Sequence, residues 1–154
     1  MESGTRDSLT KFYKEKPFSE MLENEIHRGK RYNRPFSILI IELETTPAGG
    51  KKYSQYPVLK QCSKVIRDLI RQDDIPGRLG DKLVVAIPES GLENAKKMAE
   101  RILGELGTIE FMEDGLVVHV SASIGIAVYP ENGNSPSALI GAAEKALSSA
   151  PIKS

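Results

Sequence analysis

The chain has 154 residues, which is enough for one hydrophobic core and too few for two comfortable domains. Its 21 basic and 21 acidic residues cancel, which argues against general attraction to nucleic acid or to an anionic membrane. No apolar stretch could cross a bilayer, no signal-peptide pattern opens the chain, and the single cysteine, Cys62, has no intrachain partner. We therefore expect one cytoplasmic domain over residues 5–154, with residues 1–4 as linker or expression-derived residues.

The first thirty residues predict one long or broken amphipathic helix with a basic end. Apolar residues recur at near-helical spacing from Phe12 to Ile26, and Pro17 marks the expected break. The helix then ends in the basic run His27 to Arg31. Asp7 can serve as a helix N-cap and the basic run as a solvated helix end, so neither requires a functional role.

A strand is predicted over residues 35–44, with Glu42 and Glu44 on one of its faces. Carboxylates at the end of an apolar strand are ligands that hard divalent cations prefer, and two-metal phosphoryl transfer uses such acids. A loop follows, in which Gly49 to Lys52 lack the spacing of a phosphate-binding P-loop. Pro57 then starts a predicted helix that runs to Ile70.

A β-hairpin is predicted next, with strands Ile75–Leu79 and Leu83–Ile87 joined by Gly80 and Asp81. The second strand is a short run rich in Val and Ile, which is typical of burial on both faces. The rest of the chain predicts a helix from Leu92, a long strand over 116–129 and a helix over 137–149. His119 has no neighbouring ligand residues and is expected to be structural. This order of elements indicates an α/β (α+β) fold.

The hairpin carries Arg78-Leu-Gly-Asp-Lys82, which resembles the signature of GGDEF domains, the bacterial diguanylate cyclases. Their usual form is Arg-x-Gly-Gly-Asp/Glu-Glu-Phe before an apolar strand. The opening Asp7-Ser-Leu-Thr10 and the strand sequence Ser123-Ile-Gly-Ile-Ala127 are also similar to the family pattern. The resemblance runs from Asp7 onward and implies the palm-like arrangement of nucleotide cyclases, an antiparallel-rich central sheet of about five strands flanked by helices.

The same comparison shows departures at catalytic positions. The signature lacks one glycine, Lys82 stands where the family has a catalytic Glu, and Leu83 stands at the Phe position. Glu42 and Glu44 take the places of the Asp residues that end the first strand in active members, where the first Asp helps to hold Mg²⁺. The resemblance therefore makes Glu42, Asp81 and Lys82 degenerate positions and implies no catalytic residues and no metal site.

Two further family contacts are missing. The Asp that reads guanine falls near Tyr56 in this chain, and Pro151 stands at the terminal Lys position that contacts triphosphate. Losing one electrostatic element of a catalytic site typically costs about a hundredfold to a thousandfold in rate. Several such losses together predict a domain without cyclase activity.

Just before the hairpin, Arg71-Gln-Asp-Asp74 matches the Arg-x-x-Asp motif that forms the product-binding site of many GGDEF domains. An arginine fork can donate to guanine O6 and N7 or to phosphate, and a carboxylate can accept from the guanine N–H groups. Arg28 matches a position from which some cyclases supply a second arginine, and Arg78 can assist. The alternative is a surface Arg–Asp pair at a helix end, which contributes little.

The predicted function is therefore a catalytically inactive GGDEF domain that acts as a cyclic di-GMP receptor in bacterial signalling. Its ligand site comprises Arg71, Asp74, Arg28 and Arg78, with cyclic di-GMP as ligand and no required cofactor. A second interpretation is a protein-interaction or dimerisation module that binds no nucleotide, and a third is residual cyclase activity. A protein partner or self-association stays open, and neither a nucleic acid polymer nor a membrane is expected as a partner.

Overall fold

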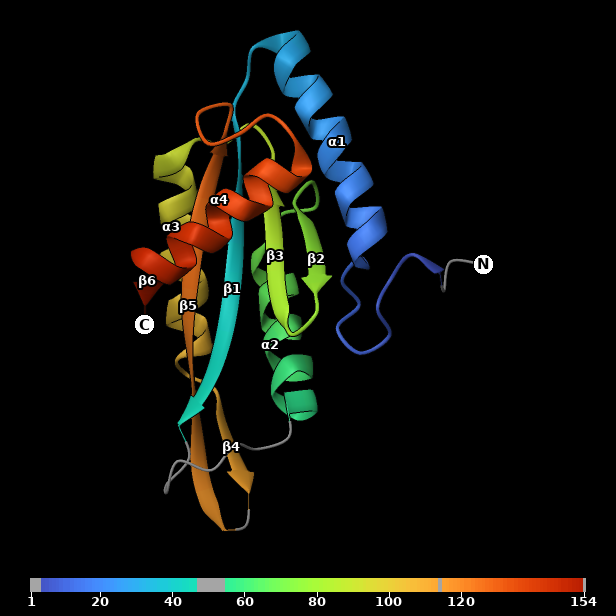
Figure 1. Ribbon diagram of the computed structural model, residues 1–154. Coiled ribbons are helices and arrows are strands. Elements are labelled where there is room, and N and C mark those ends of the chain that lie inside the picture. The colour runs from blue at the N-terminus through green and yellow to red at the C-terminus, as the bar shows by residue number, and fades with distance from the viewer. Residues whose placement is uncertain (1–3, 47–54, 114, 154) are drawn as a thin grey trace.

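The structure is a computed structural model that describes residues 4–46, 55–113 and 115–153. Within these ranges, the helices are separated by single strands or by pairs of strands (Figure 1). In chain order they are α1 (Glu15–Tyr32), β1 (Phe36–Thr46), α2 (Gln55–Leu69), β2 (Ile75–Leu79), β3 (Lys82–Ile87), α3 (Leu92–Leu106), β4 (Glu110–Glu113), β5 (Leu116–Tyr129), α4 (Pro136–Ser149) and β6 (Ile152–Lys153).

The strands form one antiparallel sheet in the order β2-β3-β1-β5-β4, with β6 paired to β5. The long strands β1 and β5 occupy its centre, and the first residues of β5, which pair with β4, extend beyond the helices (Figure 1). This is the predicted α+β arrangement with an antiparallel-rich sheet, and it is confirmed.

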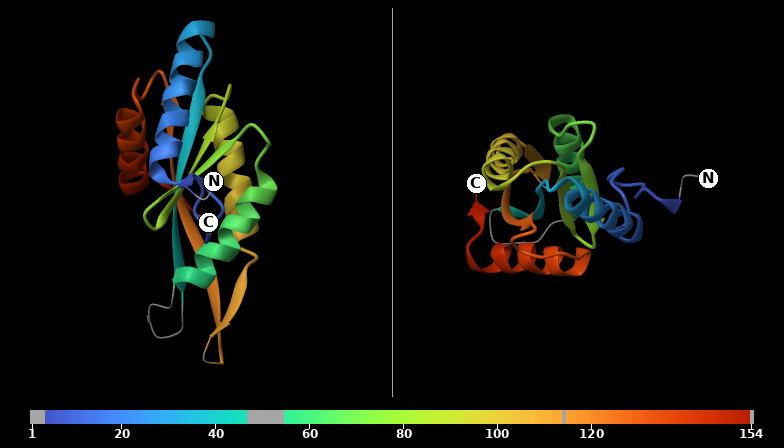
Figure 2. Two further views of the ribbon diagram at one scale, coloured as in Figure 1. Left: turned by 90° about the vertical axis from the view of Figure 1, so that its right-hand side faces the viewer. Right: turned by 90° about the horizontal axis from the view of Figure 1, so that it is seen from above.

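Helices cover both faces of the sheet. Helix α4 lies on one side, and α2 and α3 lie on the other (Figure 2). Alternate residues of β1 enter two separate hydrophobic clusters: Leu39 and Ile41 pack with α2 and α3, whereas Ile38 and Ile40 pack with α1 and α4. Because both faces are covered, the middle strands are continuous apolar runs, and residues 83–87 of β3 are all buried as predicted.

Helix α4 packs unusually close to β5 at Gly125. A Cβ at this position would overlap the backbone of Ala143 and Leu147 in α4. The helix begins where the side chain of Ser135 accepts a hydrogen bond from the Ala138 amide at 3.2 Å. The Ser-Ile-Gly-Ile-Ala pattern noted in the sequence therefore has a packing reason in this chain.

The structure corrects the prediction at the N-terminus. Helix α1 begins at Glu15, so Phe12 lies before the helix, and Pro17 lies in its first turn and does not break it. Proline is tolerated there because the first-turn amides have no partner within the helix. Phe12 is nevertheless buried, in the cluster on the α2 and α3 side of the sheet. None of the helices in the described ranges is long and apolar enough to cross a membrane.

Two short strands, β4 with four residues and β6 with two, were not predicted. Both form by pairing with the edge of β5. The turn before β5 lies at Gly115, whose φ of 78° suits glycine. The glycine-lysine loop at residues 49–52 lies outside the described residues.

Candidate functional site

The β2–β3 hairpin places the predicted site residues at two separate ends. Its strands pair from Ile75 with Ala86 to Leu79 with Lys82, and Gly80 turns the chain with a φ of 68°, as the sequence predicts. We call residues 80–82 the turn end, and residues 71–74 with residues 88–90 the open end. The five residues of β2 separate the two ends by about 17 Å.

The turn end gathers the degenerate catalytic positions. The pairing of β1 with β3 ends at Ile41 and Leu83, so Glu42 and Lys82 are each one residue beyond the last pair. Glu42 and Asp81 are exposed, and Glu44 is exposed further along the same face of β1. The lysine brings a positive charge to this end of the hairpin, which opposes the binding of a divalent cation. Among the described residues, no group of three acidic, His or Cys side chains could hold a metal ion.

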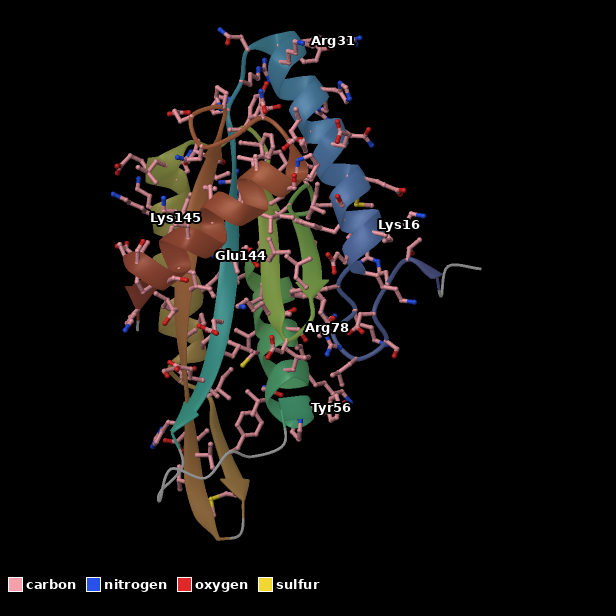
Figure 3. All side chains as sticks on the ribbon, in the orientation of Figure 1. Lys16, Arg31, Tyr56, Arg78, Glu144 and Lys145 are labelled. Carbon is pink, nitrogen blue, oxygen red and sulfur yellow. The ribbon has the colours of Figure 1, made fainter. Side chains whose placement is uncertain are left out.

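Arg78 is bound within the protein near this turn end (Figure 3). Its Nη1 donates to both carboxylate oxygens of Asp7, at 3.0 and 3.1 Å, and its Nε donates to the Gly80 carbonyl at 2.7 Å. Asp7 also accepts hydrogen bonds from the amide and hydroxyl of Thr10, both at 2.8 Å. These contacts attach the N-terminal segment to the hairpin.

The electrostatics of Asp7 reflect these contacts. Burial acts to raise the pKa of Asp7, but the hydrogen bonds from Thr10 and the Arg78 guanidinium outweigh it, so that the pKa is lowered overall. Asp7 is therefore held ionised by its own chain. It is not the predicted helix N-cap, because it lies in a turn before α1, whose N-cap is Lys14.

A groove of about 610 Å³ lies at the open end of the hairpin. Helix α1, the segment before β2, the segment after β3 and the start of α3 form its walls. Its lining includes Arg28, Arg71 and Asp74, so the structure brings three of the four predicted ligand-binding residues together. Arg78 is not among the lining residues. The full lining is Tyr13, Met21, Glu25, Arg28, Arg71, Gln72, Asp73, Asp74, Ile75, Pro88, Glu89, Ser90 and Asn94.

Asp74 is the buried acid of this groove, with 7% of its surface exposed. One carboxylate oxygen, Oδ2, accepts a hydrogen bond from the backbone amide of Arg71 at 2.8 Å, which fixes the direction of the side chain. Burial raises the pKa of Asp74, and the Arg71 amide and guanidinium partly counteract this. The Arg71 residue is exposed. The motif therefore holds a desolvated carboxylate beside an accessible guanidinium.

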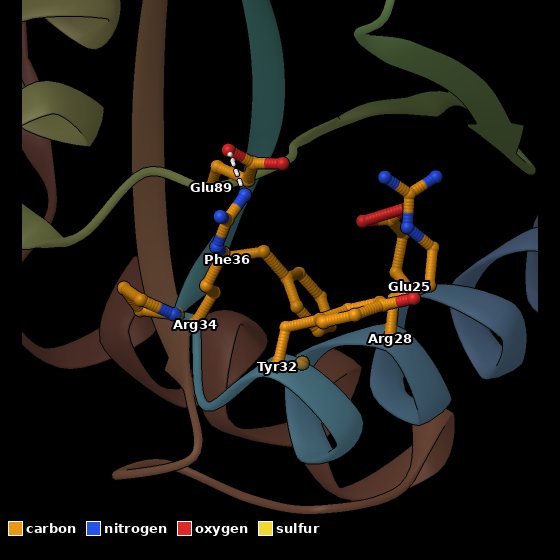
Figure 4. A pocket seen from close by; sticks show the side chains of 8 residues that line it. Glu25, Arg28, Tyr32, Arg34, Phe36 and Glu89 are labelled. Carbon is orange, nitrogen blue, oxygen red and sulfur yellow. Dashed lines mark ion pairs between the residues drawn. The ribbon is translucent and has the colours of Figure 1, made fainter.

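A second pocket, of about 280 Å³, adjoins the groove and shares Glu25, Arg28 and Glu89 with it. Figure 4 shows Glu25 and Arg28 on one side, the ion pair of Arg34 and Glu89 on the other, and two aromatic rings between them. The lining residues are Glu25, Arg28, Gly29, Tyr32, Arg34, Pro35, Phe36 and Glu89.

Of the residues that line this second pocket, only Arg28 was predicted from the sequence to bind a ligand. Glu25 carried the one available signal, because it occupies a place in the apolar stripe of α1 beside Leu22 and Ile26. It is 9% exposed, and its burial raises its pKa, while nearby Arg28 acts in the opposite direction.

Comparisons with known proteins agree with the fold. Residues 4–152 match the family model described as "Diguanylate cyclase, GGDEF domain". The diguanylate cyclase TpbB of Pseudomonas aeruginosa is 27% identical over 146 residues, which make up 92% of this chain and 34% of that protein. The chain thus spans about a third of the length of this relative.

Solved structures are similar as well. The GGDEF domain of TpbB superposes with a TM-score of 0.79 at 25% identity, covering 93% of this chain and 86% of that one. The GGDEF domain of DgcB from Caulobacter crescentus, crystallised in complex with c-di-GMP, superposes with a TM-score of 0.78 at 15% identity, covering 94% and 85%. At that identity the second match shows a shared fold.

Proposed function

The chain belongs to the GGDEF family of diguanylate cyclase domains, and from this membership we propose that it is a catalytically inactive member that serves as a receptor for cyclic di-GMP. One observation carries the proposal: Arg28, Arg71 and Asp74 line a single groove at the open end of the hairpin. The opposite end, where cyclase chemistry would take place, carries Lys82 and Glu42, each one residue beyond the last pair of β1 with β3.

The groove offers the groups that a guanine nucleotide requires. The exposed Arg71 guanidinium can donate to guanine O6 and N7, while the second oxygen of Asp74 can accept from a guanine N–H group. Arg28 reaches the groove from α1 and supplies a positive charge for phosphate. The volume of about 610 Å³ lies within the range of sites for small ligands. Arg78 is not part of the proposed site, because its guanidinium is bonded to Asp7 and Gly80.

Inactivity is proposed from the chemistry of the turn end. Formation of cyclic di-GMP requires metal ions that neutralise charge on the triphosphate during in-line attack. Here a lysine takes the place of a signature carboxylate, and Glu42 extends one methylene further from the strand than an aspartate would. Each lost electrostatic element typically costs about a hundredfold or more in rate.

Residual cyclase activity is the second candidate, and the comparisons favour it, because TpbB, a similar protein, is a diguanylate cyclase. The DgcB complex supports the receptor proposal instead, since it places c-di-GMP on a domain of the same fold. The two candidates differ in their product: only a cyclase makes cyclic di-GMP from GTP and Mg²⁺. Chromatography of such a reaction, run beside an active GGDEF protein, is expected to show no product from this chain.

Isothermal titration calorimetry with cyclic di-GMP tests the receptor function. The parent protein should bind, and Arg71→Ala should weaken binding by about a hundredfold, as expected when a bidentate contact to the edge of guanine is lost. Lys82→Ala is the matched control, because it removes a cation from the turn end of the same hairpin and should bind like the parent. Absence of binding by the parent, or equal affinity for the parent and Arg71→Ala, rejects the proposal.

A further inference from the structure

The second pocket beside the groove has the features of a nucleobase site. It adjoins the groove, because Glu25, Arg28 and Glu89 line both. A ligand held by Arg71 and Asp74 could therefore extend into it past Arg28. This inference rests on the proposed function. It concerns how the protein would bind the second nucleobase of the same ligand.

Two aromatic residues provide a platform for a planar ring. Phe36 is buried and stacks on Tyr129, with ring centroids 5.2 Å apart and planes inclined by 15°. Tyr32 stands in front of it with 58% of its surface exposed, and it lies between the charged walls of the pocket (Figure 4). A large exposed aromatic side chain beside a supported one is the arrangement on which nucleobases stack.

The walls of the pocket offer donors and acceptors in pairs. On one side the Arg28 Nε lies 3.8 Å from the Glu25 carboxylate, which is longer than a hydrogen bond. On the other side Arg34 Nη1 contacts the Glu89 carboxylate at 2.9 Å. Guanine presents N–H donors along one edge and the acceptors O6 and N7 along another, so an arginine with a carboxylate complements it. Adenine presents an amino donor in place of O6 and fits this pair less well.

Glu25 is an acid on the apolar face of α1. The residue is nearly buried, and its side chain lines both the groove and the pocket. Surface ion pairs between residues three apart on a helix are common, and such a pair would account for the position of Arg28, whose side chain is mostly exposed. It does not account for Glu25, whose side chain is mostly buried.

We infer that this pocket holds the second guanine of one cyclic di-GMP molecule, stacked on Tyr32 with its N–H edge donating to Glu25. Arg28 then stands at the junction of groove and pocket, where it contacts the phosphodiester between the two nucleosides. The first guanine is read by Arg71 and Asp74, and the second by the pocket.

The test compares three cyclic dinucleotides in calorimetric titrations: cyclic di-GMP, the 3′,3′-cyclic GMP–AMP hybrid and cyclic di-AMP. The hybrid can place its guanine against Arg71 and Asp74, so its affinity reports on the second base alone. The parent should bind cyclic di-GMP at least about tenfold more tightly than the hybrid, as one good base-edge contact provides. Cyclic di-AMP should bind most weakly.

Two variants with matched controls assign the pocket. Tyr32→Ala should weaken cyclic di-GMP binding by about tenfold through lost stacking. Tyr56→Ala, which truncates a tyrosine of similar exposure (64%) on α2 far from the groove, should bind like the parent (Figure 3). Glu25→Gln should reduce the preference for cyclic di-GMP over the hybrid by about tenfold. Glu23→Gln, on an exposed carboxylate of the same helix that lines neither the groove nor the pocket, should leave it unchanged.

The outcomes separate this inference from the proposed function. Equal affinity of the parent for cyclic di-GMP and the hybrid, or Tyr32→Ala and Glu25→Gln variants that bind both ligands like the parent, would overturn the second-guanine pocket. Binding of cyclic di-GMP that still depends on Arg71 would leave the receptor function standing in that case. Absence of cyclic di-GMP binding by the folded parent would overturn both.

Discussion

The two ends of the β2–β3 hairpin carry arginines in opposite situations. At the turn end, Arg78 donates hydrogen bonds to Asp7 and to the Gly80 carbonyl, so its guanidinium stabilises the fold. At the open end, Arg71 is exposed beside the buried Asp74, and Arg28 faces the same groove. Both acids accept a backbone amide hydrogen bond, so the difference teaches that an arginine beside an acid identifies a ligand site only when its guanidinium is not itself bonded to that acid. Asp74 is held by a backbone amide, which leaves the guanidinium available.

The strand between the two ends offers the largest expected effect. A Cβ added at Gly77, in the middle of β2, would lie 2.5 Å from the ring of Phe18, which is fully buried in α1 and cannot move aside. Gly77→Ala should therefore lower the free energy of unfolding by about 3 kcal/mol. Urea denaturation measures this. Because Phe18 anchors the helix that carries Arg28, ligand affinity should fall as well.

Gly104→Ala is the matched control for that experiment. Gly104 lies inside α3 with open space around its Cβ position, so alanine should change stability by no more than about 1 kcal/mol, and in the stabilising direction. Equal unfolding curves for the two variants would show that α1 is not packed on β2 as described.

Arg78→Ala and Arg71→Ala should separate the two ends. Arg78→Ala leaves the partly buried Asp7 without its charged partner and should cost about 1–2 kcal/mol in stability, with unchanged cyclic di-GMP affinity. Arg71→Ala should weaken cyclic di-GMP binding and change the stability by no more than about 0.5 kcal/mol, because Arg71 is exposed. Thermal unfolding and calorimetric titration of both variants are the measurements. A loss of affinity in Arg78→Ala would contradict the separation.

Acid should weaken the turn end through Asp7. Its pKa is lowered in the folded state from an ordinary 3.8, so its contribution to stability is present above that value. This contribution is lost as the pH falls below the ordinary 3.8 and through the lowered pKa. In Asp7→Asn the stability should be lower at neutral pH, and its difference from the parent should shrink over this range. A constant difference would contradict the role of Asp7.

Acid should weaken ligand binding at the open end, at a higher pH than it weakens the contacts of Asp7. The pKa of Asp74 is raised by burial, so its ionised form disfavours the folded state and protonation begins above the ordinary 3.8. A protonated Asp74 loses an acceptor for guanine, so affinity for cyclic di-GMP should fall severalfold as the pH drops through the raised pKa. Asp74→Asn should bind weakly at both pH 7 and acid pH. Titrations at several pH values measure this, and a pH-independent parent affinity would contradict it.

Much of the fold could be read from local signals. The hairpin strands and the long strand β5 were predicted to the residue or within one residue, because β-branched runs and a Gly turn mark them. The start of α1 was misplaced because Phe12 continues the apolar spacing of the helix without belonging to it. The strands β4 and β6 depend on pairing with β5, and segments this short carry almost no periodic signal of their own.

The site could be read only in part. Arg71 and Asp74 are three residues apart, so spacing alone places them together. Whether Arg28 or Arg78 joins them depends on how α1 lies across the hairpin, and the structure places Arg28 in the groove and Arg78 away from it. Glu89 shares a pocket with Glu25 although the two are far apart in sequence, and this meeting depends entirely on tertiary packing.

The most direct test of the division between the two ends is an NMR titration of ¹⁵N-labelled protein with cyclic di-GMP and, separately, with GTP and Mg²⁺. The account predicts that cyclic di-GMP shifts the amide signals of residues 71–74 and 89–90 and leaves those of residues 80–82 in place, and that GTP with Mg²⁺ moves neither set. Shifts centred on residues 80–82 with either nucleotide, together with unmoved signals at residues 71–74, would contradict it.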